Sequence, residues 1–93
     1  MIKSFGDRET ERLFHGERAR RLPSDIQQRT QRRLVQIHTA ASLADLAIPP
    51  SNQLESLRGG LRGFCSIRIN RQWRVVFEWT GSDAEKVSIV DYH

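Results

Sequence analysis

The longest periodic pattern of apolar side chains lies in residues 24–41. Apolar or small side chains recur there at steps of three or four, which is typical of an α-helix with one buried face. The stripe consists of Leu22, Ile26, Thr30, Leu34, Ile37 and Ala41, and the opposite face carries Gln28, Arg29, Gln31, Arg32 and Gln36. Ser24 and Gln27 have the spacing of a capping box. The pattern predicts an amphipathic helix over residues 24–41.

Two shorter elements are predicted before this helix. Residues 2–5 are a short apolar-alternating run that can form an edge strand. Asp7 can cap a helix whose buried side is Leu13 and Phe14, and Gly16 marks its end. This helix is short, so its stability depends on packing against the rest of the chain.

After the long helix the chain turns more often. Ser42 and Asp45 repeat the capping-box spacing and predict one further helical turn through Leu46, which the Pro-Pro pair at 49 and 50 ends. Residues 54–57 can form a strand. Residues 58–63 then carry three glycines in five positions, which predicts a sharply turning loop.

The last thirty residues have the alternation of β-strands. Three strand-length runs cover residues 64–70, 73–80 and 86–92, and the breaks between them are short enough to permit only antiparallel neighbours. One face carries Cys65, Ile67 and Ile69 from the first run, Trp73, Val75, Phe77 and Trp79 from the second, and Val87 and Ile89 from the third. The runs predict a meander with these residues in the core.

The register of the first two strands follows from this shared face. A two-residue loop would put their apolar rows on opposite sides of the sheet, so a three-residue loop or a bulge is required. Arg68 and Arg74 then share the other face, where like charges are destabilising unless an anion lies between them. Residues 57–77 contain five arginines and no carboxylate. We expect a phosphate-binding face, with a solvated strand face as the alternative.

The third strand ends in Asp91, Tyr92 and His93. Alternation puts Ser88, Val90 and Tyr92 on the basic side of the sheet and points Asp91 and His93 away from it.

Length and composition limit the fold to one small domain. A chain of 93 residues can bury one core, so we predict a single domain over residues 1–93. The expected class is α+β, a mainly antiparallel twisted sheet with the N-terminal helices packed on one face. Net charge is +4, and thirteen of the fifteen basic residues are arginine. Arginine is well suited to phosphates and bases, although a GC-rich genome also enriches it.

Other residue types exclude some function classes. Cys65 is the single cysteine, so no internal disulfide is possible, and its strand position favours a small buried hydrophobe over a reactive thiol. Neither His15 nor His38 has a partner at a metal-ligand spacing, so we expect no metal and no cofactor. No apolar run is long enough for a membrane span, and the first residues contain no signal-peptide core. We expect a cytoplasmic protein that does not bind membranes.

The terminal residues carry the groups needed to cleave RNA without a metal. Such a reaction requires a base for the 2'-hydroxyl, an acid for the leaving 5'-oxygen and cations on the phosphate. His93 is suited to be the acid or the base. Asp91 can act as the base or orient the imidazole, and Tyr92 can donate to a phosphate oxygen or stack on a base. The alternative is a frayed strand end with solvated side chains.

Arginines would supply the cations. Arg74 is the first candidate to hold the phosphate, with Arg68 and Arg58 in reserve. Arg62 and Arg71 can also reach an RNA backbone. The glycine-rich segment around Arg58 resembles neither a P-loop nor a dinucleotide-binding fingerprint, so it is a weak motif by itself.

Three segments carry a resemblance to a known family. The opening MIKSF, the run SIRINRQWRVVFEW and the closing IVDYH resemble the HigB type of bacterial toxin, a branch of the RelE-like superfamily from toxin-antitoxin pairs. The resemblance spans nearly the whole chain, and the ending is its most specific part. The charged early region and the ESL loop at residues 55–57 are similar to those of HigB-like members.

The resemblance implies a RelE-like fold and a ribosome-dependent endoribonuclease that cuts mRNA in the ribosomal A site. It implies Arg74, Asp91, Tyr92 and His93 as the catalytic group. Arg58 matches a position where relatives often have lysine; arginine keeps the charge but not the compact ammonium, so phosphate binding is the safer expectation there.

The resemblance also implies partners. A helix-turn-helix antitoxin of the HigA type would neutralise the toxin, and operator DNA would be bound only through that antitoxin. The ribosome and mRNA are the other expected partners. Two alternatives remain: a ParE-like inhibitor of gyrase, and a basic RNA-binding module without turnover.

Overall fold

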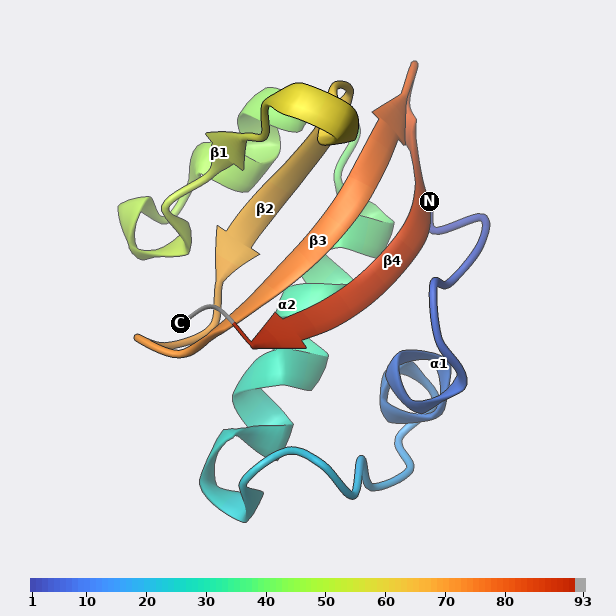
Figure 1. Cartoon of the computed structure of the whole chain (residues 1–93), viewed down its shortest axis with the longest axis vertical. Helices are drawn as coiled ribbons and strands as arrows, with labels where there is room; N and C mark the ends of the chain where they lie inside the picture. Colours follow the sequence, from blue (N-terminus) through green and yellow to red (C-terminus); the bar gives the residue numbers. More distant parts are fainter. Residues whose placement is uncertain (92–93) are drawn as a thin grey trace.

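A computed structural model of the chain describes residues 1–91 and contains two α-helices and one four-stranded sheet (Figure 1). The elements in chain order are α1 (Arg8–Phe14), α2 (Gln27–Thr39), β1 (Glu55–Ser56), β2 (Phe64–Arg68), β3 (Trp73–Thr80) and β4 (Asp83–Asp91). Short 3-10 turns lie in the connections before β2, one between the two helices, two between α2 and β1 and one between β1 and β2. The strands are antiparallel and lie in the order β1-β2-β3-β4. The predicted α+β class with an antiparallel sheet is confirmed.

The first helix begins and ends at the predicted residues. Asp7 is the N-cap of α1, and its carboxylate accepts a hydrogen bond from the Thr10 amide at 2.7 Å. Gly16 follows the helix with a φ of 91°, a left-handed conformation that glycine adopts without strain. Leu13 is buried as predicted, whereas Phe14, which was also predicted on the buried side, is only half-buried.

The long helix is shorter than predicted. Residues Ser24–Ile26 form a 3-10 turn, and α2 covers Gln27–Thr39 rather than residues 24–41. The predicted capping box is wrong, because the Gln27 side chain instead bonds both main-chain groups of Ala19 and the carbonyl oxygen of Leu22. The Gln27 side chain is therefore bound to backbone groups of the preceding loop and does not cap the start of the helix.

The far end of the apolar stripe also differs from the prediction. Ala41 is exposed, and Ala40 is buried in its place. The helix has already ended at this point, since Ala40 is the C-cap with an extended backbone. The helical period no longer applies beyond it.

The turns after α2 agree with the sequence. The carboxylate of Asp45 accepts from the amides of Ala41 and Ser42 at 2.9 and 3.2 Å, at the start of a 3-10 turn over Leu43–Ala47. The strand predicted over residues 54–57 is the two-residue β1.

The register predicted for β2 and β3 is confirmed. Arg68 pairs with Arg74, and Ile67 pairs with Val75. The Ile69 amide bonds the Trp73 carbonyl at 2.9 Å, which leaves residues 70–72 as a three-residue loop. The apolar rows of both strands therefore face the same core.

The last strand begins earlier than predicted, at Asp83 instead of residue 86. A bulge opposite Val76 and Glu78 inserts an extra residue, and Lys86 has a left-handed φ of 54°. Ala84 and Val87 are therefore both fully buried although they are three positions apart. The bulge breaks the alternation on which the prediction relied.

The core lies between α2 and one face of the sheet, where Figure 1 shows α2 crossing behind the strands. Residues Ile2 and Phe5 form parallel bridges with Ala84 and Val87 of β4, so the predicted edge strand consists of two isolated pairings. The other edge of the sheet is β1 and β2. None of the helices within residues 1–91 combines the length and apolar character needed to cross a membrane.

Candidate functional site

Arg74 lies in β3 and is buried although it is charged, with only 6% of its surface exposed. Its Nε donates to the Ser66 hydroxyl at 2.8 Å, and one Nη donates to the carbonyl oxygen of Gln53. The other Nη lies 3.7 Å from the Glu55 carboxylate. The guanidinium is therefore held in one orientation, because several of its donors already have fixed partners within the protein.

The two arginines that share a sheet face point to different partners. Arg68 lies directly opposite Arg74, but its Nε bonds the carbonyl oxygen of Asn70 at 3.1 Å. Glu55 of β1 lies opposite Ser66, so its carboxylate is on the same face of the sheet as Arg74. In the sequence, Glu55 lies two residues before the segment 57–77, which contains no carboxylate. The sequence argument missed this carboxylate, and Arg74 does not depend on an external anion to balance its charge.

The end of β4 lies next to the β2–β3 loop. Asp91 pairs with Trp73, and its carboxylate accepts a hydrogen bond from the Gln72 side chain at 3.1 Å. Val90 is the residue opposite Arg74, so Asp91 is offset by one position and alternates away from it. Asp91 is exposed.

Tyr92 and His93 lie outside the described residues, so their predicted roles remain predictions. Ser88 and Val90, which precede them, do lie on the face of Arg74, as the alternation predicts.

The remaining predicted arginines divide between the two ends of β2. Arg58 and Arg62 flank the 3-10 turn Gly59–Leu61, which leads into the first residue of β2. Arg68 lies at the opposite end of β2, and Arg71 lies in the three-residue loop that follows it. The tertiary structure therefore brings Arg68 and Arg71 toward Asp91 but leaves Arg58 and Arg62 about five residues of extended strand away, roughly 16 Å.

Two arginines of α2 were missed as candidates. Arg29 and Arg33 are four residues apart, so they lie on one side of the helix, and both bond carbonyl oxygens at the end of β2. The spacing was visible in the sequence, but the strand end beside it was not.

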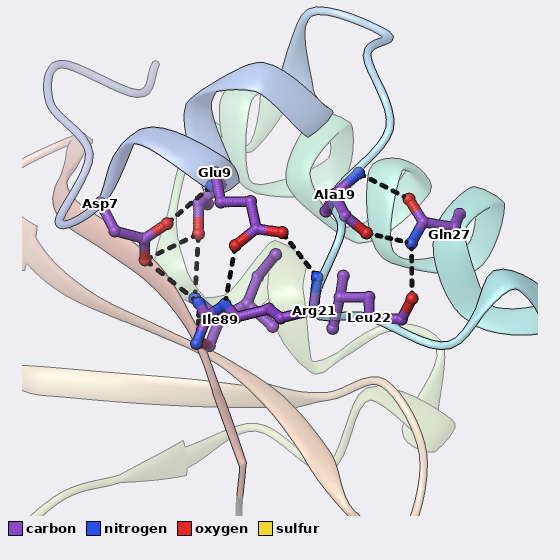
Figure 2. Close-up of polar contacts among 8 residues, drawn as sticks. Asp7, Glu9, Ala19, Arg21, Leu22, Gln27 and Ile89 are labelled. Carbon is purple, nitrogen blue, oxygen red and sulfur yellow. Dashed lines mark hydrogen bonds and ion pairs between the residues drawn. The ribbon is translucent and has the colours of Figure 1, made fainter.

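A second charged cluster lies at the β4 edge of the sheet (Figure 2). Arg21 is 3.4 Å from the Asp7 carboxylate and 3.3 Å from that of Glu9, and it donates to the Ile89 carbonyl at 2.7 Å. The Glu9 carboxylate also accepts from the Arg21 amide. The charge of Arg21 is therefore balanced by two carboxylates of the same chain.

The histidines and the cysteine have structural surroundings. His15 is exposed, and the Nδ1 atom of the half-buried His38 accepts from the Ile2 amide at 3.1 Å. Burial raises the pKa of the Cys65 thiol, against a smaller opposing effect of a hydrogen bond with Ser56, so the thiol stays protonated at neutral pH. Among residues 1–91, no group of three or more metal-binding side chains is arranged to hold an ion.

Comparison with known proteins gives matches along nearly the full length. The model of a family described as the RelE-like toxin of the type II toxin-antitoxin system HigB matches residues 3–93. A Vibrio cholerae serotype O1 protein named Toxin HigB-1 is 40% identical over 80 residues, which cover 85% of this chain and 84% of the relative. A Proteus vulgaris protein named Endoribonuclease HigB is 31% identical over 93 residues, which cover 100% of both chains. The similarity therefore extends far beyond a single motif.

Proposed function

The chain belongs to the family of RelE-like toxins of the type II toxin-antitoxin system HigB, and from this premise we propose that it is an endoribonuclease. Its substrate is mRNA, which it cleaves in the A site of the translating ribosome without a metal ion. Cleavage stops translation and inhibits growth. The name of the Proteus vulgaris relative supports this assignment.

The observation that carries the proposal is the strand register at one end of the sheet. Arg68 and Arg74 are direct neighbours on β2 and β3, and β4 reaches the same end at Asp91. Tyr92 and His93 follow Asp91 in the sequence. Although Asp91 alternates away from Arg74, we propose that its carboxylate and the two residues that follow it act on a phosphodiester held at this strand end.

Each group has a role in the proposed reaction. The 2'-oxygen attacks the adjacent phosphorus as the Asp91 carboxylate accepts its proton, and the bond to the 5'-oxygen breaks as the protonated imidazole of His93 donates a proton to that oxygen. The products are a 2',3'-cyclic phosphate and a 5'-hydroxyl. Arg74 stabilises the charge that develops on the phosphate oxygens, and Tyr92 donates a hydrogen bond to one of them.

The other arginines bind the RNA backbone. Arg68 and Arg71 lie beside the proposed cleavage position. Arg58 and Arg62 lie at the other end of β2, so they contact a more distant part of the RNA.

The family implies an antitoxin partner. We assign it to the helix-turn-helix HigA type, and the toxin binds operator DNA only through it. The ribosome and mRNA are the remaining partners, and the site of action is the cytoplasm, where translation takes place.

Primer-extension mapping of cellular mRNA after induction tests this function. New 5' ends that depend on ongoing translation, and that disappear in Arg74→Ala and His93→Ala, are the expected result. Intact mRNA with blocked supercoiling would identify a gyrase inhibitor instead. RNA binding without new 5' ends would identify a module that does not cleave.

A further inference from the structure

A hollow of about 560 Å³ lies between α2 and the loop that joins β2 to β3. Its lining includes Arg29, Arg33, Ser51, Arg68, Asn70 and Arg71. We call it the arginine hollow. Two of its arginines come from α2, one from the end of β2 and one from the β2–β3 loop, so the cluster exists only in the folded protein.

Backbone contacts hold three of these guanidinium groups. Arg29 donates to the Ile69 carbonyl at 3.3 Å and Arg33 to the Arg68 carbonyl at 3.0 Å, while Arg68 donates to the Asn70 carbonyl. In the described part of the chain each of the three makes one hydrogen bond, and a guanidinium has five N–H groups. The contacts therefore orient the side chains and leave donors for a ligand.

The positive charge of the hollow is not balanced by an ion pair within residues 1–91. No carboxylate lines it, and the ion pairs found within residues 1–91 all involve other residues. Burial, and then the charge of Arg29, lower the pKa of the Arg33 guanidinium, but an arginine remains charged at neutral pH. Like charges four apart on a helix are also unfavourable. A bound anion would remove this repulsion.

We propose that the arginine hollow binds a phosphate of an RNA strand, next to the strand end that carries the proposed cleavage group. This inference rests on the proposed function. Planar guanidinium groups match phosphate oxygens with paired hydrogen bonds. Arg68 belongs both to the hollow and to the pair with Arg74, and Gln72 links the adjacent loop to Asp91. One RNA strand can therefore contact the hollow and the end of β4 together.

The phosphate can belong to mRNA or to ribosomal RNA. The chemistry at the hollow is the same in both cases, because arginine contacts to phosphate carry no sequence information. Separate binding measurements with each RNA distinguish the two sources.

The test compares two double variants with the same loss of charge. Arg29→Gln with Arg33→Gln removes the helix side of the hollow, while Arg18→Gln with Arg20→Gln removes two exposed arginines near the β4 edge. Binding is measured by fluorescence anisotropy with a 2'-O-methyl oligoribonucleotide, which cannot be cleaved through its 2'-oxygen, and by co-sedimentation with ribosomes. Both measurements are repeated across a series of salt concentrations.

The hollow variant is expected to bind at least roughly tenfold more weakly than the matched control. For the oligoribonucleotide, the slope of log affinity against log salt should decrease by about 0.7 for each phosphate that the variant no longer binds. A weakening with the oligoribonucleotide assigns the hollow to mRNA, and a weakening with ribosomes alone assigns it to ribosomal RNA. The proposal is overturned if both double variants bind RNA equally weakly, or if the hollow variant keeps its affinity for both RNAs. It is also overturned if the hollow variant loses antitoxin binding but not RNA binding.

Two further measurements keep the outcomes separate. Arg71→Gln removes an exposed arginine of the hollow that caps no carbonyl among the described residues, so it tests the site if the double variant fails to fold. Weakened RNA binding by Arg71→Gln supports the hollow and unchanged binding overturns it. Cleavage by the wild-type protein is measured in parallel. If the wild type does not cleave RNA, the proposed function is wrong whatever the hollow binds.

Discussion

The two edges of the sheet use arginine in opposite ways. At the β4 edge, Thr10 accepts from the Ile89 amide at 3.2 Å and Arg21 donates to the Ile89 carbonyl, and Arg21 is balanced by two carboxylates. At the β2 edge, Arg29 and Arg33 also bond strand carbonyls, but no carboxylate lines the hollow there.

The difference separates an arginine that stabilises the fold from one that is available to a ligand. Both kinds satisfy a backbone carbonyl at a sheet edge, where unpaired groups would otherwise accept another strand. Only the unbalanced kind leaves a net positive charge at the surface. Charge balance around each arginine is therefore more informative than the number of arginines in the chain.

The largest expected effect concerns Arg74. Its guanidinium is also paired with a carboxylate, so charge balance alone would assign it to the fold rather than to a ligand. We predict that Arg74→Ala lowers the rate of RNA cleavage by roughly 100 to 1000-fold, because it removes the proposed contact with the phosphate. Arg74→Lys should recover little, because an ammonium lacks the planar fork. Single-turnover cleavage on programmed ribosomes measures the rates.

Folding must be controlled in that experiment, because Arg74 holds Ser66 and Gln53. Rates are expressed per folded molecule, with the folded fraction taken from thermal unfolding. Arg32→Ala, an exposed position on α2, is the charge-matched control. An unchanged rate per folded molecule would make Arg74 a structural arginine like Arg21 and refute its catalytic role.

A smaller effect is expected at the β4 edge. Arg21→Ala should lower the free energy of unfolding by about 1–2 kcal/mol, since it removes the bond to the Ile89 carbonyl and two partly exposed ion pairs. The melting temperature should fall by about 4–8 °C for each kcal/mol. Arg20→Ala, the exposed neighbour, should change it little. If Arg21→Ala weakened RNA binding more than Arg20→Ala without loss of stability, the comparison of the edges would fail.

The smallest effect concerns free phosphate. A ligand at ten times its Kd stabilises the folded state by about 1.4 kcal/mol, so inorganic phosphate should raise the melting temperature of the wild type more than that of the Arg29→Gln, Arg33→Gln variant. Phosphate also stabilises proteins in general by exclusion from their surface. The Arg18→Gln, Arg20→Gln control measures that general part. Identical shifts in all three proteins would contradict specific binding at the hollow.

Much of the architecture could be predicted from local pattern. The period of the apolar residues identified α2 and the three long strands, and the cap at Asp7 with the stop at Gly16 identified α1. Each of these signals depends on the neighbours of a residue in the chain. The requirement that two apolar rows share one core also predicted a three-residue loop or a bulge, with Arg68 and Arg74 on one face. The structure has the loop, and the two arginines are paired directly. These inferences succeeded because one buried face admits one register.

Contacts between distant segments could not be predicted in this way. The bulge at Lys86, the use of Gln27 by the Ala19–Leu22 loop, and the approach of Glu55 to Arg74 each depend on partners that only the fold brings together. The same distinction between local pattern and distant contacts applies to the candidate site. Its arginines and terminal acid could be named from residue type and strand position, whereas the arginine hollow required α2 to pass beside the end of β2. Local periodicity selects the elements, but the charge around each arginine is set by packing in three dimensions.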